Sequence, residues 1–508
     1  MLAAIRSAAV QGIEAYPVTV EVDAAQGLPQ WTIVGLAAGA VKESRERVGA
    51  ALVNAGFRLP PRRITINLAP ADVRKEGTAF DLPIALGVLV ATGQLSDDAV
   101  QGRLYLGELG LDGSVRGVRG ALPVARLAGA ARLPLVLPVP NVTEASLVGE
   151  LVLHAPATLV ELVEQMRNGG LPRASIPAVM PVAQREALDL ADVVGQAAAK
   201  RALEIAAAGG HNVLLVGPPG AGKTMLARRL PGILPALAEC DALEATAIHS
   251  VAGTLAPGEA IVGTGPFRAP HHSISDAGLI GGGNPPRPGE VSLAHRGVLF
   301  LDEMLEFRRG VLEALRQPME DGRVVIARAA CAIAYPARFA LIGAMNPCPC
   351  GAAGDPTRHC VCSAPDVSRY RARLSGPLAD RIDMHVTVGA VSVRALSDRG
   401  DGKRSADVRV RVEAARDVQR LRYARMPHVG CNAHAAGRWL DARSPVESVA
   451  RELLAAAAER MALSARGYHR VLKVARTIAD LDAEEIVRQP HVAEALRYRP
   501  AIAAPVAA

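Results

Sequence analysis

The chain has no long hydrophobic run, although half of its 508 residues are hydrophobic. No stretch approaches the roughly 20 apolar residues that a membrane-spanning helix needs. The first 18 residues, MLAAIRSAAVQGIEAYPV, are interrupted by charge and glycine and lack the continuous apolar core of a signal peptide. We therefore expect a cytoplasmic protein without a membrane partner. No internal repeat is evident.

Lysine is scarce, because only six of the 57 basic residues are lysine and the remainder are arginine. The net charge of +7 is compatible with nucleic-acid binding. Alanine is also abundant, however, and both biases are typical of a GC-rich genome, so the arginine count carries little functional information. The length predicts two to three domains, each with its own core.

One stretch carries a specific chemistry: residues 217–224, GPPGAGKT, match the phosphate-binding pattern G-x-x-x-x-G-K-[ST] at each fixed position. An apolar strand, VLLV, precedes the loop, and MLARRL is expected to continue as a helix. Backbone N–H groups of such a loop surround phosphate oxygens, and the helix N-terminus attracts the same anion. The candidate nucleotide-binding residues are Gly217, Pro218, Pro219, Gly220, Ala221, Gly222, Lys223 and Thr224.

Lys223 is placed to reach the β- and γ-phosphates of ATP, and Thr224 to bind Mg²⁺ through its hydroxyl. Residues 298–303, VLFLDE, form an apolar strand that ends in two carboxylates, the Walker B pattern. Asp302 is expected to hold the Mg²⁺ shell and Glu303 to orient or deprotonate the attacking water. A third apolar strand, FALIGAMN, ends in Asn346, which is suited to position that water.

Four of the seven cysteines lie in residues 348–362, CPCGAAGDPTRHCVC. The two C-x-C pairs, Cys348 with Cys350 and Cys360 with Cys362, are compatible with a closed Cys₄ zinc site. Such a site would be structural and would stiffen the loop after Asn346. Free or redox-active thiols are the alternative, and His359 is a possible substitute ligand.

Residues 265–295, between the two Walker motifs, form an insert rich in glycine and proline, which predicts loops and excludes a core strand. Its histidines, His271, His272 and His295, raise the possibility of a metal site. No cysteine or carboxylate nearby completes tetrahedral spacing, so we favour a conformational or pore-facing role for these side chains.

Residues 1–165 read as an α/β domain with strands at 18–23, 31–34 and 64–68 and helices at 40–54 and 80–95. The runs IVGLAAGAVKESRERVGAAL, RRITINLAPADVRKEGTAFDLPIALGVL and GELGLDGSVRGVRG resemble the ChlI-type N-terminal domain of Mg-chelatase-like AAA+ ATPases. That domain is related in fold to Lon proteases (S5 domain 2-like). Ala79 stands where a Lon-type protease carries its serine nucleophile, so we expect no protease activity.

The resemblance extends over nearly the whole chain and identifies it as a member of the YifB/ComM group of Mg-chelatase-like AAA+ proteins. The quoted matches include PFRAPHH in the insert, the cysteine block and SARGYHRVLKVARTIADL near the end. The implied fold class is α/β: a Lon-like domain, a P-loop AAA+ core and a C-terminal helical lid. The expected boundaries are 1–165, a Pro- and Gly-rich linker at 166–187, the core at 188–394 and the lid at 408–497.

Further site residues follow from the resemblance. The LADRID run is similar to the arginine-finger segment of related motors, which implies that Arg381 reaches the γ-phosphate in a neighbouring subunit. An ion pair to Asp380 or Asp383 is the alternative role, while Arg373 and, less directly, Arg369 are alternative fingers. Arg466 aligns with the sensor 2 arginine, which contacts the γ-phosphate from the lid; the alternatives are Arg470, Lys473 and Arg476. The candidate DNA-contacting residues of the insert are Arg268, His271, His272 and Arg287.

The resemblance implies a homo-hexameric helicase that uses ATP and Mg²⁺ to drive branch migration on single-stranded or branched DNA during natural transformation. Two other readings stay open. One is a metal-insertion motor like the Mg-chelatase I subunit, although this chain has no integrin-like metal domain. The other is a protein-remodelling or transcription-associated ATPase. DNA-stimulated hydrolysis that weakens with salt distinguishes the DNA motor from both.

Overall fold

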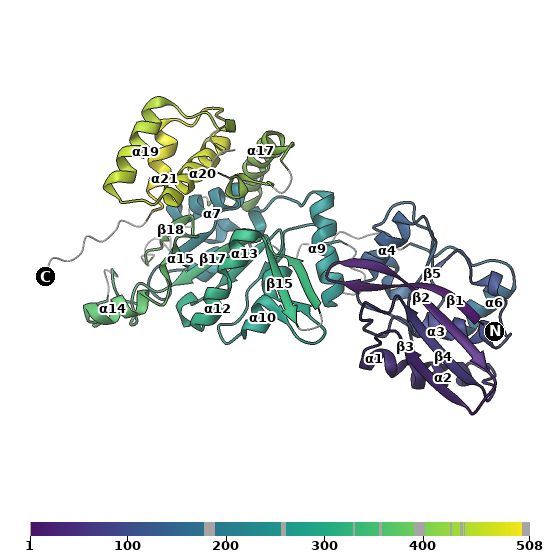
Figure 1. Ribbon diagram of the computed structural model, residues 1–508. Helices are drawn as coiled ribbons and strands as arrows, with labels where there is room; N and C mark the ends of the chain where they lie inside the picture. Colours follow the sequence, from purple (N-terminus) through teal and green to yellow (C-terminus); the bar gives the residue numbers. More distant parts are fainter. Residues whose placement is uncertain are drawn as a thin grey trace.

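The computed structural model describes residues 2–176, 188–255, 261–328, 331–354, 358–390, 402–426, 429–436, 440 and 442–499. Residues 177–187, which make up half of the expected linker, lie outside this description. The molecule is elongated, with an N-terminal α/β region at one end, a central region around a parallel sheet and a helical C-terminal region above it (Figure 1). The expected α/β class with a helical lid is confirmed.

The N-terminal region is built on a four-stranded sheet in the order β1-β2-β4-β3. Its strands are β1 (Leu2–Gln11), β2 (Glu14–Ala25), β3 (Gln30–Val34) and β4 (Arg63–Ala69). Buried and more accessible residues alternate along β2 and β4, because one face of the sheet packs on α3 (Asp81–Ala91), in which every residue is buried.

The three strands expected in this region are confirmed, and the two helices are corrected. The expected helix at 40–54 is two helices, α1 (Gly39–Lys42) and α2 (Ser44–Asn54). The expected helix at 80–95 ends at Ala91. Strand β1 was not expected, since its small and charged residues give a weak hydrophobic pattern; its pairing with β2 over its whole length fixes it.

The remainder of the N-terminal region contains a short parallel sheet in the order β5-β8-β9. Around it lie helices α4 (Ala121–Ala130), α5 (Val142–Ala145) and α6 (Leu159–Arg167). The three strands are β5 (Leu104–Tyr105), β8 (Leu135–Val136) and β9 (Leu153–His154). A hairpin of β6 (Glu108–Leu109) and β7 (Val115–Arg116) completes this part.

The central region contains a five-stranded parallel sheet in the order β11-β14-β17-β10-β18. Its strands are β10 (Val213–Val216), β11 (Phe267–Arg268), β14 (Val298–Leu301), β17 (Ala340–Met345) and β18 (Met384–Thr387). The inner strands are continuous hydrophobic runs because both faces of a parallel sheet are covered. All carboxyl ends meet at one edge, and the residues that follow β10, β14 and β17 converge there.

The insert contains a short strand that the loop prediction did not include. Phe267 and Arg268, both half-buried, pair with Val298 and Leu299 as the edge strand of the sheet, so the strand is not a core strand. An edge position tolerates the arginine, since one side of the strand stays open. The rest of the insert is short elements: α10 (Asp276–Ile280), a hairpin of β12 (Gly281–Gly282) and β13 (Arg287–Pro288), and α11 (Glu290–Leu293).

Several other helices and a hairpin surround the central sheet. Helix α8 (Lys223–Ala227) follows the phosphate-binding loop but ends earlier than MLARRL predicted; a 3₁₀ turn containing Pro231 follows, which cannot continue the α-helical hydrogen bonds. The other elements are α7 (Ala197–Gly209), α9 (Glu239–Ala252), α12 (Arg309–Ala314), α13 (Arg316–Asp321), α14 (Ala364–Arg371), α15 (Gly376–Ala379) and the hairpin of β15 (Arg323–Arg328) and β16 (Cys331–Pro336).

The C-terminal region consists of α17 (Ser405–Tyr423), α19 (Ser448–Arg460), α20 (Ala465–Leu481) and α21 (Gln489–Leu496). The helices expected from hydrophobic periodicity in this region are confirmed. Their apolar faces share one hydrophobic cluster with α7 and with strands β10 and β18 of the sheet. None of the described helices is both long and apolar enough to cross a membrane.

The N-terminal region docks on the central region at two places. The turn between β1 and β2 lies against β16, and Ile13 packs beside the central hydrophobic cluster. On α9, the backbone of Ser250 accepts a hydrogen bond from Gly120 N–H at 3.1 Å, and its hydroxyl donates to the buried Glu144 at 2.5 Å. The contact joins this region to α9, the last described helix before the insert.

Candidate nucleotide-binding site

The phosphate-binding loop leaves β10 in the middle of the sheet and enters α8. The backbone at Gly217 has no room for a side chain, since a Cβ atom there would lie 2.1 Å from the carbonyl oxygen of Val388. Gly220 and Gly222 have φ of +80° and +88°, a conformation that other residues adopt only under strain. The glycines of the motif therefore shape the loop as the sequence pattern requires.

Lys223 lies inside this loop. Its Nζ donates hydrogen bonds to the carbonyl oxygens of Gly217 at 2.7 Å and Pro218 at 2.9 Å, and to Oδ1 of Asn346 at 3.1 Å. Burial lowers the pKa of this ammonium, while Asp302 and Glu303 act in the opposite direction. The lysine is thus held where a phosphate in the loop would lie.

Thr224 and Asp302 are brought together from α8 and from the end of β14. The threonine hydroxyl donates to Oδ2 of Asp302 at 2.7 Å. A hydroxyl and a carboxylate at this separation, both of them oxygen ligands, suit Mg²⁺. Glu303 follows with an exposed side chain and a left-handed backbone, φ +49°, and its N–H donates to Oδ1 of Asp302 at 3.0 Å. Such strain at a non-glycine residue is typical of functional positions.

Asn346 completes the set at the carboxyl end of β17, next to β10. The structure therefore gathers four side chains predicted from the sequence, those of Lys223, Thr224, Asp302 and Asn346, with Glu303 beside Asp302. One supporting residue was not expected. Gln196 donates through Nε2 to the carbonyl oxygens of Ala221 at 3.2 Å and Gly389 at 2.6 Å, and so braces the phosphate-binding loop. No motif marks this glutamine in the sequence.

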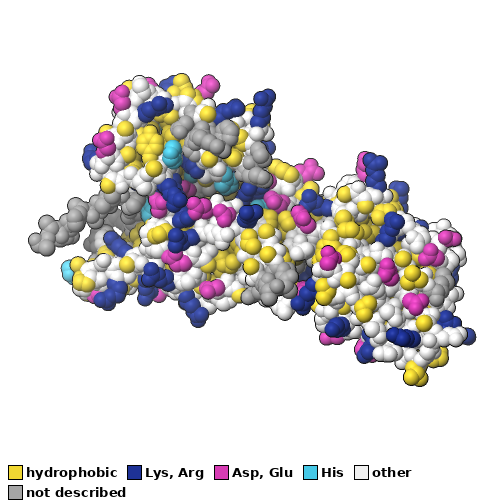
Figure 2. Space-filling model, viewed as in Figure 1, with side chains coloured by type: hydrophobic (Ala, Val, Ile, Leu, Met, Phe, Trp, Pro, Cys, Tyr) yellow, Lys and Arg dark blue, Asp and Glu magenta, His cyan; other side chains and the backbone are white. Residues whose placement is uncertain are grey.

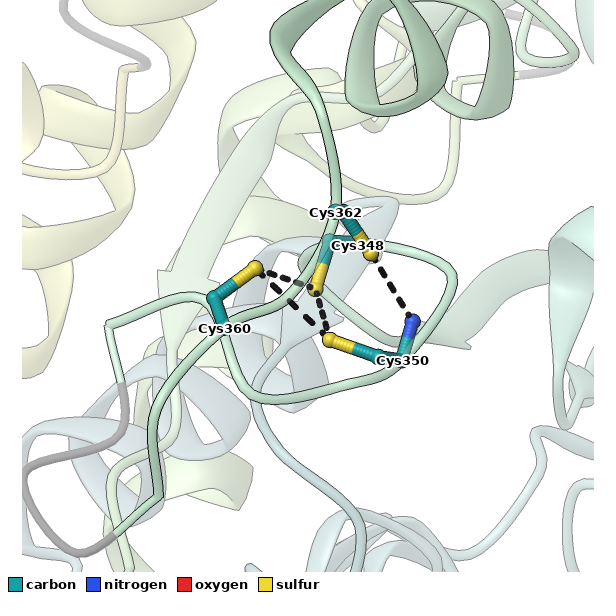
Figure 3. Close-up of side chains that lie close together, drawn as sticks. All are labelled: Cys348, Cys350, Cys360 and Cys362. Carbon is teal, nitrogen blue, oxygen red and sulfur yellow. Dashed lines mark hydrogen bonds between the residues drawn. The ribbon is translucent and has the colours of Figure 1, made fainter.

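The four cysteines of the block lie close together, after Asn346 in the chain (Figure 3), and we call the described residues of the block, 348–354 and 358–362, the cysteine loop. Its four Sγ atoms all lie within 4.8 Å of one another. Sγ of Cys348 is 3.4 Å from that of Cys350 and 3.7 Å from that of Cys360, and Cys350 and Cys360 are 3.6 Å apart. Two backbone N–H groups, of Cys350 and Ala353, donate to sulfurs at 3.4 and 3.3 Å.

These distances fit a tetrahedral zinc site. With Zn–S bonds of 2.3 Å, the sulfurs of a Cys₄ site lie about 3.8 Å apart. Backbone N–H groups that donate to the sulfurs orient metal-binding thiolates in such sites. His359 is exposed and does not belong to the group of four, so the substitute-ligand alternative has no support in the geometry.

Arg381 lies at the opposite edge of the sheet from the phosphate-binding loop. It precedes β18 at its amino end, where Asn212, just before β10, donates to the Arg381 carbonyl oxygen. The four residues of β10 span about 13 Å between this edge and the loop. The guanidinium of Arg381 pairs with Glu320 of α13 and donates to the carbonyl oxygen of Pro377 at 2.8 Å. It therefore faces away from the nucleotide site of its own chain.

Arg466, in the first turn of α20, lies on the same side as Arg381. Its guanidinium is 3.4 Å from Glu320, so one carboxylate serves both arginines and its pKa is lowered by them, Arg381 first. Arg466 therefore lies beside Arg381, and its predicted contact with the γ-phosphate from the lid stays a prediction. Glu320 was not expected from any motif.

A polar groove of about 740 Å³ surrounds this arginine pair. Arg470 and Lys473, from the next turns of α20, line it together with Asp383. Arg470 lies 3.7 Å from the Asp383 carboxylate, whose pKa is about 2 because His211, Arg470 and the N–H of Asn212 outweigh the effect of burial. The described lining of the groove thus carries five Lys and Arg side chains and three carboxylates.

The alternative arginines occupy other surroundings. Arg373 donates to the carbonyl oxygen of Leu305 at 3.1 Å, close to the carboxyl end of β14, and Arg369 lies 3.6 Å from Asp366 at the surface. Arg476 is fully buried and paired with Asp480 at 3.0 Å. Of the arginines named from the sequence, Arg381, Arg466 and Arg470 are the ones brought together.

The candidate DNA-contacting residues differ in whether their side chains are already paired within the chain. Arg268 forms a bidentate ion pair with Glu290 at 2.6 and 2.7 Å, which occupies its guanidinium. The rings of His271 and His272 contact each other with centroids 4.1 Å apart and planes tilted by 34°, and Arg287 is exposed on the β12–β13 hairpin. Figure 2 shows Lys and Arg side chains spread among acidic ones on the visible face rather than gathered into one patch.

His295 does not point to a pore. Its side chain is buried, Nε2 is 2.8 Å from Glu244, and Nδ1 accepts the N–H of Arg338 at 3.0 Å. Burial lowers the pKa of the ring, while the hydrogen bond to His295 is the main reason that the pKa of Glu244 falls to about 2. This histidine fixes the base of the insert, which the sequence offered as one of its alternatives.

The strand, loop and helix around Lys223, with Asp302 at the end of β14 in the same parallel sheet, define a P-loop nucleotide-binding protein. Profiles described as "Subunit ChlI of Mg-chelatase", "Magnesium chelatase, subunit ChlI" and "Magnesium chelatase, subunit ChlI C-terminal" match residues 20–141, 189–396 and 402–499, respectively.

The chain is 44% identical to Competence protein ComM of Haemophilus influenzae, with 98% of this chain and 97% of that protein covered. It is 42% identical to Uncharacterized protein YifB of Escherichia coli, again with 98% of this chain and 97% of that protein covered. The Magnesium-chelatase 38 kDa subunit of Rhodobacter capsulatus is 28% identical over 34% of this chain and 53% of its own length. The chain belongs to the YifB/ComM family of Mg-chelatase-like AAA+ proteins.

Proposed function

We propose that this protein is a Mg²⁺-dependent ATPase that acts as a hexameric DNA motor, a ComM-like helicase that promotes branch migration of recombining strands during natural transformation. The main observation in support of a hexameric ring is that the predicted catalytic residues lie at two opposite edges of one sheet. Lys223, Thr224 and Asp302 lie at the carboxyl edge, whereas Arg381 and Arg466 lie at the amino edge.

This division supports catalysis between subunits. An arginine that faces away from the nucleotide of its own chain is available to a neighbour, where it stabilises the charge on the transferring phosphoryl group. A ring repeats such a head-to-tail contact around a closed circle. In this proposal the polyphosphate of an adjoining subunit enters the groove around Arg381 and Arg466, in which Lys and Arg side chains outnumber carboxylates.

The geometry supports the following roles within one site. The loop N–H groups and Lys223 bind the β- and γ-phosphates, and Thr224 and Asp302 hold the Mg²⁺ shell. Glu303, whose carboxylate is exposed next to this pair, takes the proton of the attacking water, and Asn346 orients it. Arg381 and Arg466 from the neighbour complete the charge stabilisation.

The DNA substrate is supported by the 44% identity with a protein named for competence over nearly the whole of both chains. The insert supplies the contacts in this proposal: Arg287 is exposed on a hairpin, and His271 and His272 lie on the adjoining loop. The ion pair of Arg268 with Glu290 assigns that arginine to holding the loop rather than to binding phosphate.

The experiment is ATP hydrolysis measured with no DNA and with single-stranded, forked and four-way-junction DNA, with Glu303→Gln as the blank. We expect stimulation by DNA, unwinding of the branched substrates, and a loss of stimulation as salt rises, because phosphate contacts release counterions. An ATP hydrolysis rate that none of these DNA molecules changes would contradict the proposal of a DNA motor. Stimulation by a protein lysate would then favour a remodelling ATPase, and co-purification with a porphyrin-binding subunit a metal-insertion motor.

Zinc is a further part of the proposal. Cys348, Cys350, Cys360 and Cys362 would bind one structural ion, supported by the sulfur spacing and by the N–H groups directed at the sulfurs. The four thiolates leave no open coordination position, so the ion would take no part in the chemistry and would fix the loop after Asn346.

A further inference from the structure

The cysteine loop touches the phosphate-binding loop at one point. Gly351, which follows Cys350, has its backbone against the ring of Pro219; a Cβ atom at Gly351 would lie 2.5 Å from Cδ and 2.7 Å from Cγ of that proline. Real Cβ atoms do not approach so closely, so the contact admits only glycine. The same segment begins at Asn346, whose side chain accepts a hydrogen bond from Lys223.

The segment is also tied to the helix that follows it. Cys362 is one residue before α14, and Ser363 caps that helix by accepting the N–H of Asp366. Arg371, at the other end of α14, donates through Nε to the carbonyl oxygen of Pro347 at 3.2 Å. The segment is therefore joined to the nucleotide site through Asn346 and Gly351, and to α14 through Ser363 and Arg371.

We propose that the four-cysteine loop positions the phosphate-binding loop through Gly351 and Pro219, so that nucleotide affinity depends on the four thiolates remaining assembled. Gly351 and the cysteines are positioning residues in this proposal, since none of them contacts the nucleotide. Loss of the metal, or oxidation of the thiolates to disulfides by a thiol oxidant, would release the loop and weaken ATP binding. The proposal rests on the assignment of ATP as the ligand, and not on the assignment of DNA.

The chain offers a matched pair of glycines for the test. Gly351 and Gly354 have φ of +78° and +79°, so alanine introduces the same backbone strain at both. The Cβ atom at Gly354 meets no described atom within 4 Å, whereas that at Gly351 meets Pro219. The difference between Gly351→Ala and Gly354→Ala thus measures the contact with the phosphate-binding loop and cancels the strain.

The readout is the dissociation constant of a fluorescent ATP analogue, with the zinc content of each variant measured alongside it. We expect Gly351→Ala to weaken binding roughly 10- to 100-fold, since misplacement by about 1 Å has effects of this size, and to retain its zinc. Gly354→Ala should stay within about twofold of the natural protein. Equal affinities for the two variants would overturn the proposal.

A second change should restore binding. Pro219→Ala removes the Cδ and Cγ atoms that the new Cβ would meet, so the double variant Gly351→Ala, Pro219→Ala should bind the analogue as tightly as Pro219→Ala alone. Coupling of this kind is what a double-mutant cycle detects. Additive losses in the double variant would contradict the direct contact.

The thiolates are tested by a matched pair of cysteines. Cys350 and Cys240 are both exposed, but Cys240 lies outside the group of four. We expect Cys350→Ser, or removal of zinc by a chelator, to weaken analogue binding as Gly351→Ala does, and Cys240→Ser to have no effect. Unchanged affinity after the zinc has left would overturn the proposal. Because no DNA is present, a failure of the DNA-motor assignment would leave these results unaffected.

Discussion

Single residues in this protein owe their roles to the edge of the sheet on which they lie. Lys223 and Asn346 come from parts of the sequence 123 positions apart, yet their side chains are 3.1 Å apart because β10 and β17 are adjacent and parallel. Arg381 lies before the first residue of β18, which is parallel to β10, and therefore it lies at the opposite edge of the sheet. The chemical type of a residue makes it a candidate for the site, and the direction of its strand decides at which edge of the sheet it lies.

Glu303 gives the sharpest prediction at this scale. We expect Glu303→Gln to bind ATP but to lower its turnover by about 10²-fold or more, because an amide cannot accept the proton of the attacking water. Single-turnover hydrolysis and analogue binding measure the two effects separately. Glu306→Gln, three residues later and outside the strand end, is the control. Near-normal turnover in Glu303→Gln would refute the assigned role.

At the scale of elements, helix α20 combines structural and functional positions. Arg466 and Arg470 at its start face the groove, whereas Arg476 near its end is buried and donates to Asp480 and to two carbonyl oxygens. The Asp480 carboxylate also accepts a hydrogen bond from the guanidinium of Arg422 of α17 at 2.5 Å. The helix is therefore fixed at one end by a buried ion network and places Arg466 and Arg470 in the groove at the other.

This network predicts a large loss of stability on truncation. Asp480→Ala should lower the free energy of unfolding by about 3–5 kcal/mol, because it leaves two buried guanidinium groups without their carboxylate. Asp482→Ala is the matched control; its side chain is 44% exposed and its pairs with Arg201 and His491 are long. We expect a change below about 1 kcal/mol there. Urea unfolding followed by circular dichroism measures both.

The cysteine loop gives the second prediction at this scale. Metal analysis of the purified protein should find about one zinc per chain, since a closed Cys₄ site binds a single ion. Replacing any one of the four cysteines by serine should remove the zinc, whereas Cys240→Ser should not. A metal-free natural protein, purified without chelators, would contradict the site.

At the scale of the whole molecule, the arginine pair on Glu320 makes the single chain an incomplete enzyme in our proposal. Arg381→Ala should reduce ATP turnover by about 10³-fold or more, in the range known for arginine fingers. Mixing this variant with Lys223→Ala chains should restore part of the activity, because some interfaces then combine an intact loop with an intact arginine. Turnover measured against the mixing ratio tests this, and two inactive variants that stay inactive when mixed would argue against catalysis between subunits.

Much of the local structure followed from the sequence. The hydrophobic runs that form β10, β14 and β17 are continuous because both faces of the sheet are covered, and each ends at the residue type that its motif requires. The amphipathic periods of α17, α19 and α20 likewise identified the lid. Strand β1 and edge strand β11 were not predicted, since small, polar or charged residues weaken their hydrophobic patterns. Pairing with a neighbouring strand determines that these residues are extended.

The sequence by itself determined which residues can perform the chemistry: the phosphate-binding loop, the carboxylate pair after β14, the four cysteines and the arginines near β18 and α20. Only the tertiary structure decided how these groups are combined. It joined Arg381 and Arg466 through Glu320, buried His295, tied Arg268 to Glu290 and set Gly351 against Pro219. Motifs record local spacing along the chain, whereas these pairings depend on strand order and helix packing between residues far apart in sequence.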